Sequence, residues 1–175
     1  MVQPRYSVFI AASLDGFIAR ANGGIDWLAI VDRAGEDYGF QAFFSTIDAM
    51  VIGRKTYETA LGFDAWPYAG KRVVVLTHST RTSRHGEEFF AGNPAELAQQ
   101  LGAQGVKHVY VDGGSVIAQF LRDNRVDELT VSVIPILLGE GAPLAPGVGR
   151  DVNLQLVAHR VFESGLVQLV YRPRA

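Results

Sequence analysis

Three short segments of the sequence place phosphate-binding groups directly after runs of apolar, β-branched residues. The first, VIGRKTYE, runs from Val51 to Glu58 and puts a glycine, two cations and a hydroxyl at the end of such a run. The second run, VVVL, is followed by THSTR (77–81), and the third, HVYV, by DGGS (112–115). Backbone N–H groups at a helix start, Arg or Lys side chains and hydroxyls all donate hydrogen bonds to phosphate. Each segment therefore has the chemistry of an anion-binding strand end.

Any one of these segments is also consistent with a plain turn, or with a helix start whose charges are solvated. Three of them together favour a dinucleotide or another multiply phosphorylated ligand, because ligands of parallel α/β sheets bind beyond the carboxyl ends of the strands. The dinucleotide fingerprint GxGxxG is absent, so an ordinary Rossmann domain is not expected.

Other common chemistries find little support in the residue types. The chain has no cysteine, which excludes disulfides, thiolate catalysis and zinc sites with Cys ligands. Its four histidines form no pair at ligand spacing, and no HExxH or GxSxG motif occurs. We therefore expect no metal site and no serine-hydrolase site.

The apolar runs and the segments between them predict an α/β fold. Strands are expected at 6–13, 49–53, 72–77, 108–114 and 128–139, where nearly continuous apolar runs are typical of strands buried on both faces. Helices are expected at 36–47, at 94 to 102 or 105 with Asn93 as N-cap, and at 115–124. Alternating strands and helices indicate a mostly parallel sheet.

The carboxyl-terminal part departs from this alternation. Residues 154–162 and 165–172 are two strands joined at Glu163-Ser164-Gly165, which predicts an antiparallel hairpin. Residues 139–150 are a Gly/Pro-rich loop near one edge of the sheet and not a domain boundary, so residues 1–175 are interpreted as one domain.

Bulk composition limits the classes of partner. A formal net charge of -2 on 175 residues gives no basic field for nucleic acid or for an anionic membrane. No stretch approaches the roughly 20 apolar residues of a membrane helix, and the amino terminus does not have the pattern of a signal peptide. These features, with the absence of cysteine, fit a cytoplasmic protein whose partners are small molecules.

The chain resembles the dihydrofolate reductase fold family, and within it the branch that contains the reductase domain of riboflavin biosynthesis. The resemblance rests on IAASLDGFIA (10–19), IDAMVIGRKTYE (47–58), VVVLTHS (73–79), VYVDGGSVIAQFL (109–121) and the C-terminal hairpin, in that order. It implies a three-layer α/β/α domain with a sheet of about eight strands and a bound NADPH.

The resemblance also implies which positions hold the cofactor. Next to the nicotinamide it places Ala11, Ala12 and Ile18. The residues expected around the pyrophosphate and the adenosine phosphates are Gly53, Arg54, Lys55 and Thr56. The residues expected around the adenine ribose and its 2′-phosphate are Leu76, Thr77, His78 and Ser79. At the next helix start, facing the pyrophosphate, the resemblance places Gly113, Gly114, Ser115 and Val116. A cis peptide is expected at the glycine pair as in dihydrofolate reductases, or at Asp112-Gly113, which aligns equally well if no gap is allowed.

The substrate side is assigned by spacing within the same resemblance. The dihydrofolate reductases carry an acid sixteen positions before the glycine of the GR(x)T strand, which here is Asp37, with Asp26, Asp32 and Glu36 as rivals. The alternative reading of Asp37 is an exposed acid in a first helical turn, favoured by the helix dipole. The riboflavin-type phosphate pattern after the SLDG turn is reduced here to Arg33.

Together these features predict an NADPH-dependent reductase that transfers hydride to a pterin, an aminopyrimidine or a similar flat heterocycle. Trp27, Tyr38, Phe40 and Trp66 are candidates for stacking on the substrate, or alternatively for core packing. The alternative function is a non-catalytic nucleotide-binding protein that kept the cofactor site. The resemblance to the riboflavin branch further implies a homodimer, which would cover apolar strand surface at the C-terminal hairpin.

Overall fold

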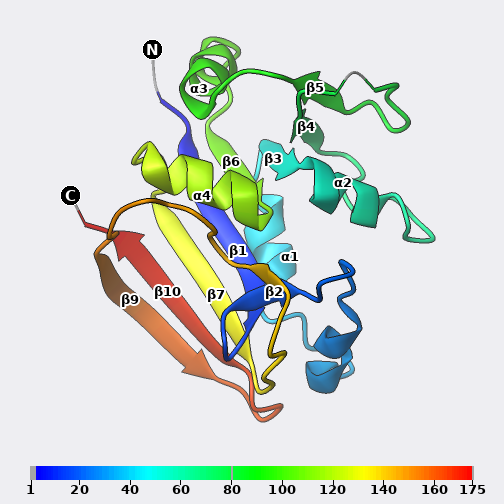
Figure 1. Cartoon of the computed structure of the whole chain (residues 1–175), viewed down its shortest axis with the longest axis vertical. Helices are drawn as coiled ribbons and strands as arrows, with labels where there is room; N and C mark the ends of the chain where they lie inside the picture. Colours follow the sequence, from blue (N-terminus) through cyan, green and yellow to red (C-terminus); the bar gives the residue numbers. More distant parts are fainter. Residues whose placement is uncertain (1–2, 80, 175) are drawn as a thin grey trace.

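An eight-stranded sheet runs through the part of the chain that the computed structural model describes, residues 3–79 and 81–174 (Figure 1). Its spatial order is β5-β4-β3-β6-β1-β7-β10-β9. The six strands from β5 to β7 are mutually parallel, and β10 is antiparallel to both of its neighbours. The strands are β1 (Arg5–Ser13), β3 (Ala49–Gly53), β4 (Arg72–Leu76), β5 (Glu88–Phe90), β6 (His108–Asp112), β7 (Glu128–Ile134), β9 (Leu154–Val161) and β10 (Val167–Pro173). The predicted fold class is confirmed.

Helices cover the two faces of the parallel part of this sheet. On one face lie α3 (Pro94–Ala103) and α4 (Gly114–Arg122), which pack on Val51 and Val111 among others. On the opposite face lies α1 (Phe40–Ser45), which packs on Met50 and Tyr110. Adjacent residues of β3 and β6 thus face different helical layers, which explains why these strands read as continuous apolar runs.

Local sequence signals account for where the helices begin. The Asn93 side chain accepts a hydrogen bond from the Glu96 backbone, and the Glu96 carboxylate accepts one from the Asn93 backbone. Helix α3 therefore starts with the predicted cap. The helix expected at 36–47 is shorter than predicted and begins at Phe40. Tyr38 and Gly39 have φ values of 56° and 82°, a left-handed conformation that a continuous α-helix does not tolerate. The segments α2 (Arg54–Ala60) and the 3₁₀-helix η1 (Asp26–Val31) complete the helices.

Three short strands are absent from the prediction. β5 has three residues, and β2 (Phe17–Ala19) pairs with β8 (Ala142–Pro143) in a separate two-stranded ribbon. Segments of two or three residues carry no periodic signal, so only the tertiary contacts reveal them.

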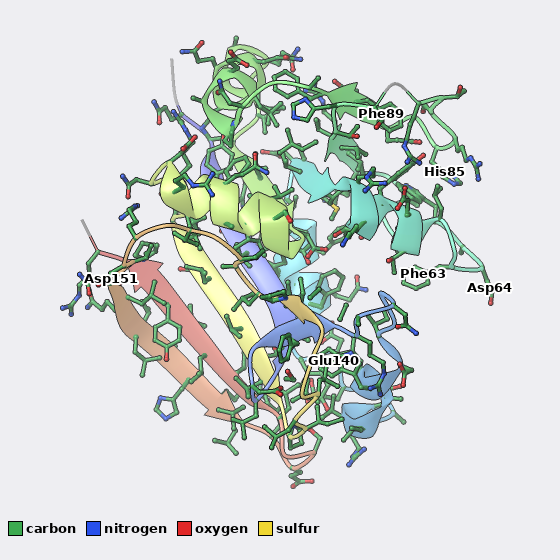
Figure 2. The ribbon with its side chains drawn as sticks, viewed as in Figure 1. Phe63, Asp64, His85, Phe89, Glu140 and Asp151 are labelled. Atoms are coloured by element: carbon green, nitrogen blue, oxygen red, sulfur yellow. The ribbon has the colours of Figure 1, made fainter. Side chains whose placement is uncertain are left out.

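The SLDG turn holds the loop 139–150 across the end of the sheet. The Asp15 carboxylate accepts hydrogen bonds from the Ser13 hydroxyl and from the backbone of Leu138 and Gly139. These bonds lower the pKa of Asp15, the Ser13 hydroxyl most strongly. Glu140 marks this loop in Figure 2, near β2. The SLDG motif therefore positions the loop that begins after β7.

Candidate active site

The connections of the sheet diverge between β3 and β6. From β3 the chain passes through α2 to β4, and from β6 it passes through α4 to β7 in the opposite direction. Ile52 of β3 lies beside Asp112 of β6, so both strands end at the same point (Figure 1). The crevice at such a topological switch point is where open parallel sheets bind their ligands.

The structure brings the three predicted strand ends together at this point. Gly53 is paired with Leu76 of β4. A Cβ atom added to Gly113 would lie 2.6 Å from the Thr56 hydroxyl oxygen, and one added to Gly53 would lie 3.2 Å from Val116. The starts of α2 and α4 are therefore neighbours, as the candidate phosphate site requires.

Both helix starts lack a side-chain cap. α2 follows Gly53 and α4 follows Gly113, and neither N-cap residue donates or accepts a capping hydrogen bond through a side chain. α3, which starts away from the switch point, has a complete capping box. Since the first N–H groups of a helix need an acceptor, the two uncapped starts leave donors for phosphate oxygens.

Glycine is needed at the two positions where α4 starts, for a different structural reason at each. Gly113 has a φ of +96°, which favours glycine. At Gly114 an added Cβ would lie 2.3 Å from the carbonyl oxygen of Pro143, so this glycine allows the loop 139–150 to pass. The predicted cis peptide at the pair is wrong, because the peptide bonds of the described residues are all trans.

Cations lie at the outer end of the site. Arg54 and Arg81 both pair with Glu58, at N–O distances of 3.5 and 2.7 Å. Lys55 is exposed, as are His78 and Ser79 at the end of β4. The backbone of Ser79 donates to the Thr77 hydroxyl, which shapes this turn. Thr80, the remaining hydroxyl of the predicted tip, lies outside the described residues.

Three more predicted cofactor positions lie on or near β1. Ala11 and Ala12 are successive residues of the strand and face opposite sides of the sheet, toward η1 and toward α4 respectively. Ile18 lies in β2 and packs against the apolar cluster under α4. These residues flank the switch point from the β1 side.

The Asp112 carboxyl is a feature of the site that the motif analysis did not single out. It is half-buried at the end of β6 and accepts a hydrogen bond of 2.8 Å from the backbone of Gly113. Burial raises the pKa of Asp112 to about 6, against the opposing effect of that hydrogen bond. Its charge contributes to the raised pKa values of Tyr68 and Tyr110, after their own burial. The only signal in the sequence was an acid at the end of a buried strand.

The Asp37 carboxylate instead holds the start of α1. Its two oxygens accept hydrogen bonds of 2.9 Å from the backbone of Gly39 and of Gln41, and these bonds lower the pKa of Asp37. The side chain is exposed. Its assignment to the substrate remains a prediction, and its observed contacts are those of a helix-capping acid.

The rival acids also have local contacts. Asp26 forms a bidentate pair with Arg20, at 2.8 and 2.9 Å, and Glu36 accepts from the backbone of Tyr38. Asp32 is exposed.

Three of the four candidate stacking residues, Tyr38, Phe40 and Trp66, have aromatic partners in the protein, and the fourth, Trp27, is buried in an apolar cluster. Trp27 is buried beside Val31, and Tyr38 packs edge-on against Phe162. Phe40 contacts Phe9, Phe44 and Tyr110, and Trp66 stacks on His85 with centroids 4.5 Å apart. His85 lies on the loop that leads to β5 (Figure 2).

A buried carboxylate fixes that loop beside the site. Glu87 accepts hydrogen bonds from the Tyr57 and Ser83 hydroxyls and from the backbone of Arg84 and His85. Although burial acts in the opposite direction, these donors lower the pKa of Glu87 to about 2. The loop is thus tied to α2 through a single charged group.

Glu87→Gln is expected to destabilise the protein by about 3 kcal/mol at pH 7, because a carboxylate pKa of about 2 lies some two units below its ordinary value of 4.5. The stabilisation is complete above the ordinary pKa and is lost as the pH falls toward 2, since the folded state binds the proton less tightly. Urea unfolding between pH 3 and pH 7 measures both effects. The control is Glu88→Gln at an exposed ion pair with Arg72, which should change stability by less than about 1 kcal/mol.

The described residues contain no group of three or more His, Cys, Asp or Glu that would hold a metal ion. Within the same residues, no helix has the length and apolarity needed to cross a membrane.

The fold is that of an open, mostly parallel α/β protein with its candidate site at a topological switch point. A family model described as the RibD C-terminal domain matches residues 4–168, and the chain belongs to this family. It is 36% identical to the uncharacterized protein YyaP of Bacillus subtilis (strain 168), over 97% of this chain and 95% of that protein.

Two further comparisons agree. A crystal structure from Shewanella sp. PV-4, named for riboflavin biosynthesis, superposes with a TM-score of 0.91 at 34% identity and covers 98% of this chain and 99% of that one. The riboflavin biosynthesis protein RibD of Corynebacterium ammoniagenes is 30% identical over 79% of this chain but only 45% of its own length. The chain thus matches a part of RibD and nearly the whole of YyaP.

Proposed function

We propose that the protein is an NADPH-dependent reductase that transfers a hydride to a flat nitrogen heterocycle of the pterin or aminopyrimidine class. The observation that supports this most strongly is the half-buried Asp112 carboxyl, with its pKa raised to about 6, at the switch point between two uncapped helix starts. Membership of the RibD C-terminal domain family supports the reaction class.

The residues at the switch point fit a dinucleotide. Gly53 and Gly113 let the starts of α2 and α4 lie close together, and neither N-cap residue provides a side-chain acceptor for the first N–H groups of its helix. Arg54 and Arg81 supply positive charge at the outer end, where the 2′-phosphate of NADPH would bind. NADPH would supply the hydride, and the protein would hold its reactive ring against the substrate.

Asp112 is the candidate proton donor. Reduction of a C=N bond adds a hydride to carbon and a proton to nitrogen, so an acid must lie beside the substrate nitrogen. A carboxyl with a pKa of about 6 is protonated in part of the population near neutral pH. Asp37 is the alternative donor, although its oxygens already accept two backbone hydrogen bonds.

The second candidate function is a nucleotide-binding protein without turnover. It predicts saturable NADPH binding but no loss of absorbance at 340 nm with any heterocycle. A panel of pterins and ribosylaminopyrimidines, each incubated with NADPH and the protein, separates the two functions. Oxidation of NADPH that depends on one of these substrates supports the reductase, and its absence across the panel contradicts it.

Arg54 is expected to give a preference for NADPH over NADH of about one to two decades in dissociation constant, because a charge-assisted hydrogen bond contributes roughly 1.5–3 kcal/mol. Titration of intrinsic fluorescence with each cofactor measures the preference. Arg54→Gln should reduce it at least several-fold, whereas Arg33→Gln, an exposed arginine on another loop, should leave it unchanged. Equal affinity of the wild-type protein for both cofactors would contradict the assignment of Arg54.

A homodimer is proposed through the strand face of β9 and β10. Leu156 is 48% exposed and is paired with Tyr171, and Val161 is 69% exposed and is paired with Val167. No helix lies over β9 and β10 in Figure 1. Exposed apolar surface of this kind at a sheet edge is typical of a protein interface.

Light scattering at micromolar concentration should give about twice the 19.0 kDa mass of one chain. Leu156→Glu should shift the protein toward the monomer, because the carboxylate would be buried without a partner in the interface. Gln155→Glu alters the neighbouring residue, which is paired with Arg172, and should leave the dimer intact. A wild-type mass near 19.0 kDa throughout this range would contradict the dimer.

A further inference from the structure

A cavity of about 720 Å³ lies at the amino-terminal edge of the sheet, where β1 and β7 begin and α4 has ended. The candidate cofactor site lies at the opposite edge, beyond the carboxyl ends of the same parallel strands. Its charged and polar lining includes Arg5, Tyr6, Asp123, Arg125, Asp127 and Arg172.

Two of its lining residues carry buried polar atoms without a hydrogen-bond partner. Among the described residues, the buried side-chain atoms in this condition are the Tyr6 hydroxyl, the Arg125 Nε and the Trp27 Nε1. Tyr6 is only 2% exposed. Because a buried polar group without a partner is costly, two of them at one cavity point to a missing acceptor.

Among the cations that line the cavity, Arg125 is the one without an ion-pair partner in the described residues. Arg5 and Arg172 both pair with Glu128, at 3.0 and 3.1 Å. Asp127 accepts a hydrogen bond of 2.7 Å from the backbone of Tyr6. No ion pair joins Arg125 to an acid of the described chain within 4.0 Å. Its guanidinium therefore has both charge and donors available.

We propose that this cavity binds a small oxyanion, a carboxylate or a phosphate group, through the Arg125 guanidinium and the Tyr6 hydroxyl. A guanidinium presents parallel N–H donors that match two oxygens of such a group. Burial raises the pKa of Tyr6 to about 12, so its hydroxyl remains protonated and donates. Both atoms are buried in the structure, so the proposal expects the long Arg125 side chain to move toward the ligand on binding.

Asp123 and Asp127 also line the cavity, and they select the form of ligand. Two carboxylates at the rim oppose a highly charged anion and favour one that carries a single anionic group or an additional donor. The two probes are therefore inorganic phosphate, whose monoanion carries hydroxyl donors, and acetate, which carries a single carboxylate. Each is titrated separately against the full chain by calorimetry in a buffer without other oxyanions.

The proposal expects saturable binding of one probe at one site per chain. Arg125→Gln and Tyr6→Phe should each weaken that binding at least tenfold, since each removes one donor. Tyr6→Phe keeps the aromatic packing on Phe120, so it remains informative if Arg125→Gln does not fold. Arg174→Gln is the control, because this exposed arginine at the end of the chain does not line the cavity.

Phosphate binding at the candidate cofactor site is distinguished by Arg54→Gln. Binding that Arg54→Gln abolishes and that Tyr6→Phe leaves unchanged would place the ion at the opposite edge and overturn the proposal. The absence of saturable binding for both probes, or an equal loss in Arg174→Gln, would overturn it as well.

Discussion

Asp112→Asn is expected to lower turnover by roughly 10²–10⁴-fold, the usual effect of losing a positioned general acid. The same substitution is expected to raise the free energy of unfolding at pH 7 by roughly 1–3 kcal/mol. In the folded protein the pKa of Asp112 is about 6, above its ordinary 3.8, so the ionised carboxyl is disfavoured there by burial. Its destabilising effect is absent below the ordinary pKa of 3.8, develops as the pH rises from there to about 6, and is complete above that pH. Loss of activity with a gain in stability is the signature of a residue kept for function.

Steady-state kinetics and urea unfolding of the same Asp112→Asn preparation measure the two effects. The pH profile of the wild-type protein should show turnover falling as the pH rises above about 6, and the variant should lack this dependence.

The matched comparison is Asp37→Asn, which removes a charge that caps α1. If Asp112 is the donor, Asp37→Asn should lower stability modestly and retain most of the turnover. A loss of 10²–10⁴-fold in Asp37→Asn, with near-full turnover in Asp112→Asn, would return the role to Asp37. Glu36→Gln serves as the neighbouring control for Asp37, because its carboxylate contacts only the backbone of Tyr38.

Gly114→Ala is expected to destabilise the protein by roughly 3 kcal/mol, at the upper end of the overpacking range. The added Cβ would lie 2.3 Å from the Pro143 carbonyl oxygen and 3.3 Å from Pro146. Backbone cannot move aside like a flexible side chain, so either the start of α4 or the loop 139–150 must shift. Because α4 begins at the proposed phosphate site, NADPH affinity should fall together with stability.

Thermal unfolding and NADPH titration of Gly114→Ala measure this coupling. Gly62→Ala is the control, since its added Cβ would lie 3.3 Å from one carbonyl oxygen and at an exposed position away from the sheet. Gly62→Ala should shift stability by less than about 1 kcal/mol. Unchanged stability and affinity in Gly114→Ala would show that the loop does not pack against α4 in solution.

The sequence alone determined the class of fold and the edge of the sheet at which the candidate site lies. Long apolar runs such as 49–53 and 108–114 predict strands buried on both faces, and the capping pattern at Asn93 predicts where α3 starts. Parallel strands end at one edge by necessity, so the three candidate anion-binding segments had to meet there. Local sequence is sufficient for these features because each depends on neighbours along the chain.

Only the tertiary structure showed that the acid at the end of β6, Asp112, is partly buried. Spacing alone favoured Asp37, whereas folding buries Asp112 beside Tyr68 and Tyr110 and raises its pKa. The sequence also did not reveal the role of Gly114, because the residue that approaches it, Pro143, lies 29 positions further along the chain. Burial and close approach depend on residues distant in sequence, and a pKa follows burial. The order of residues along the chain therefore does not give the burial of a side chain or its close contacts.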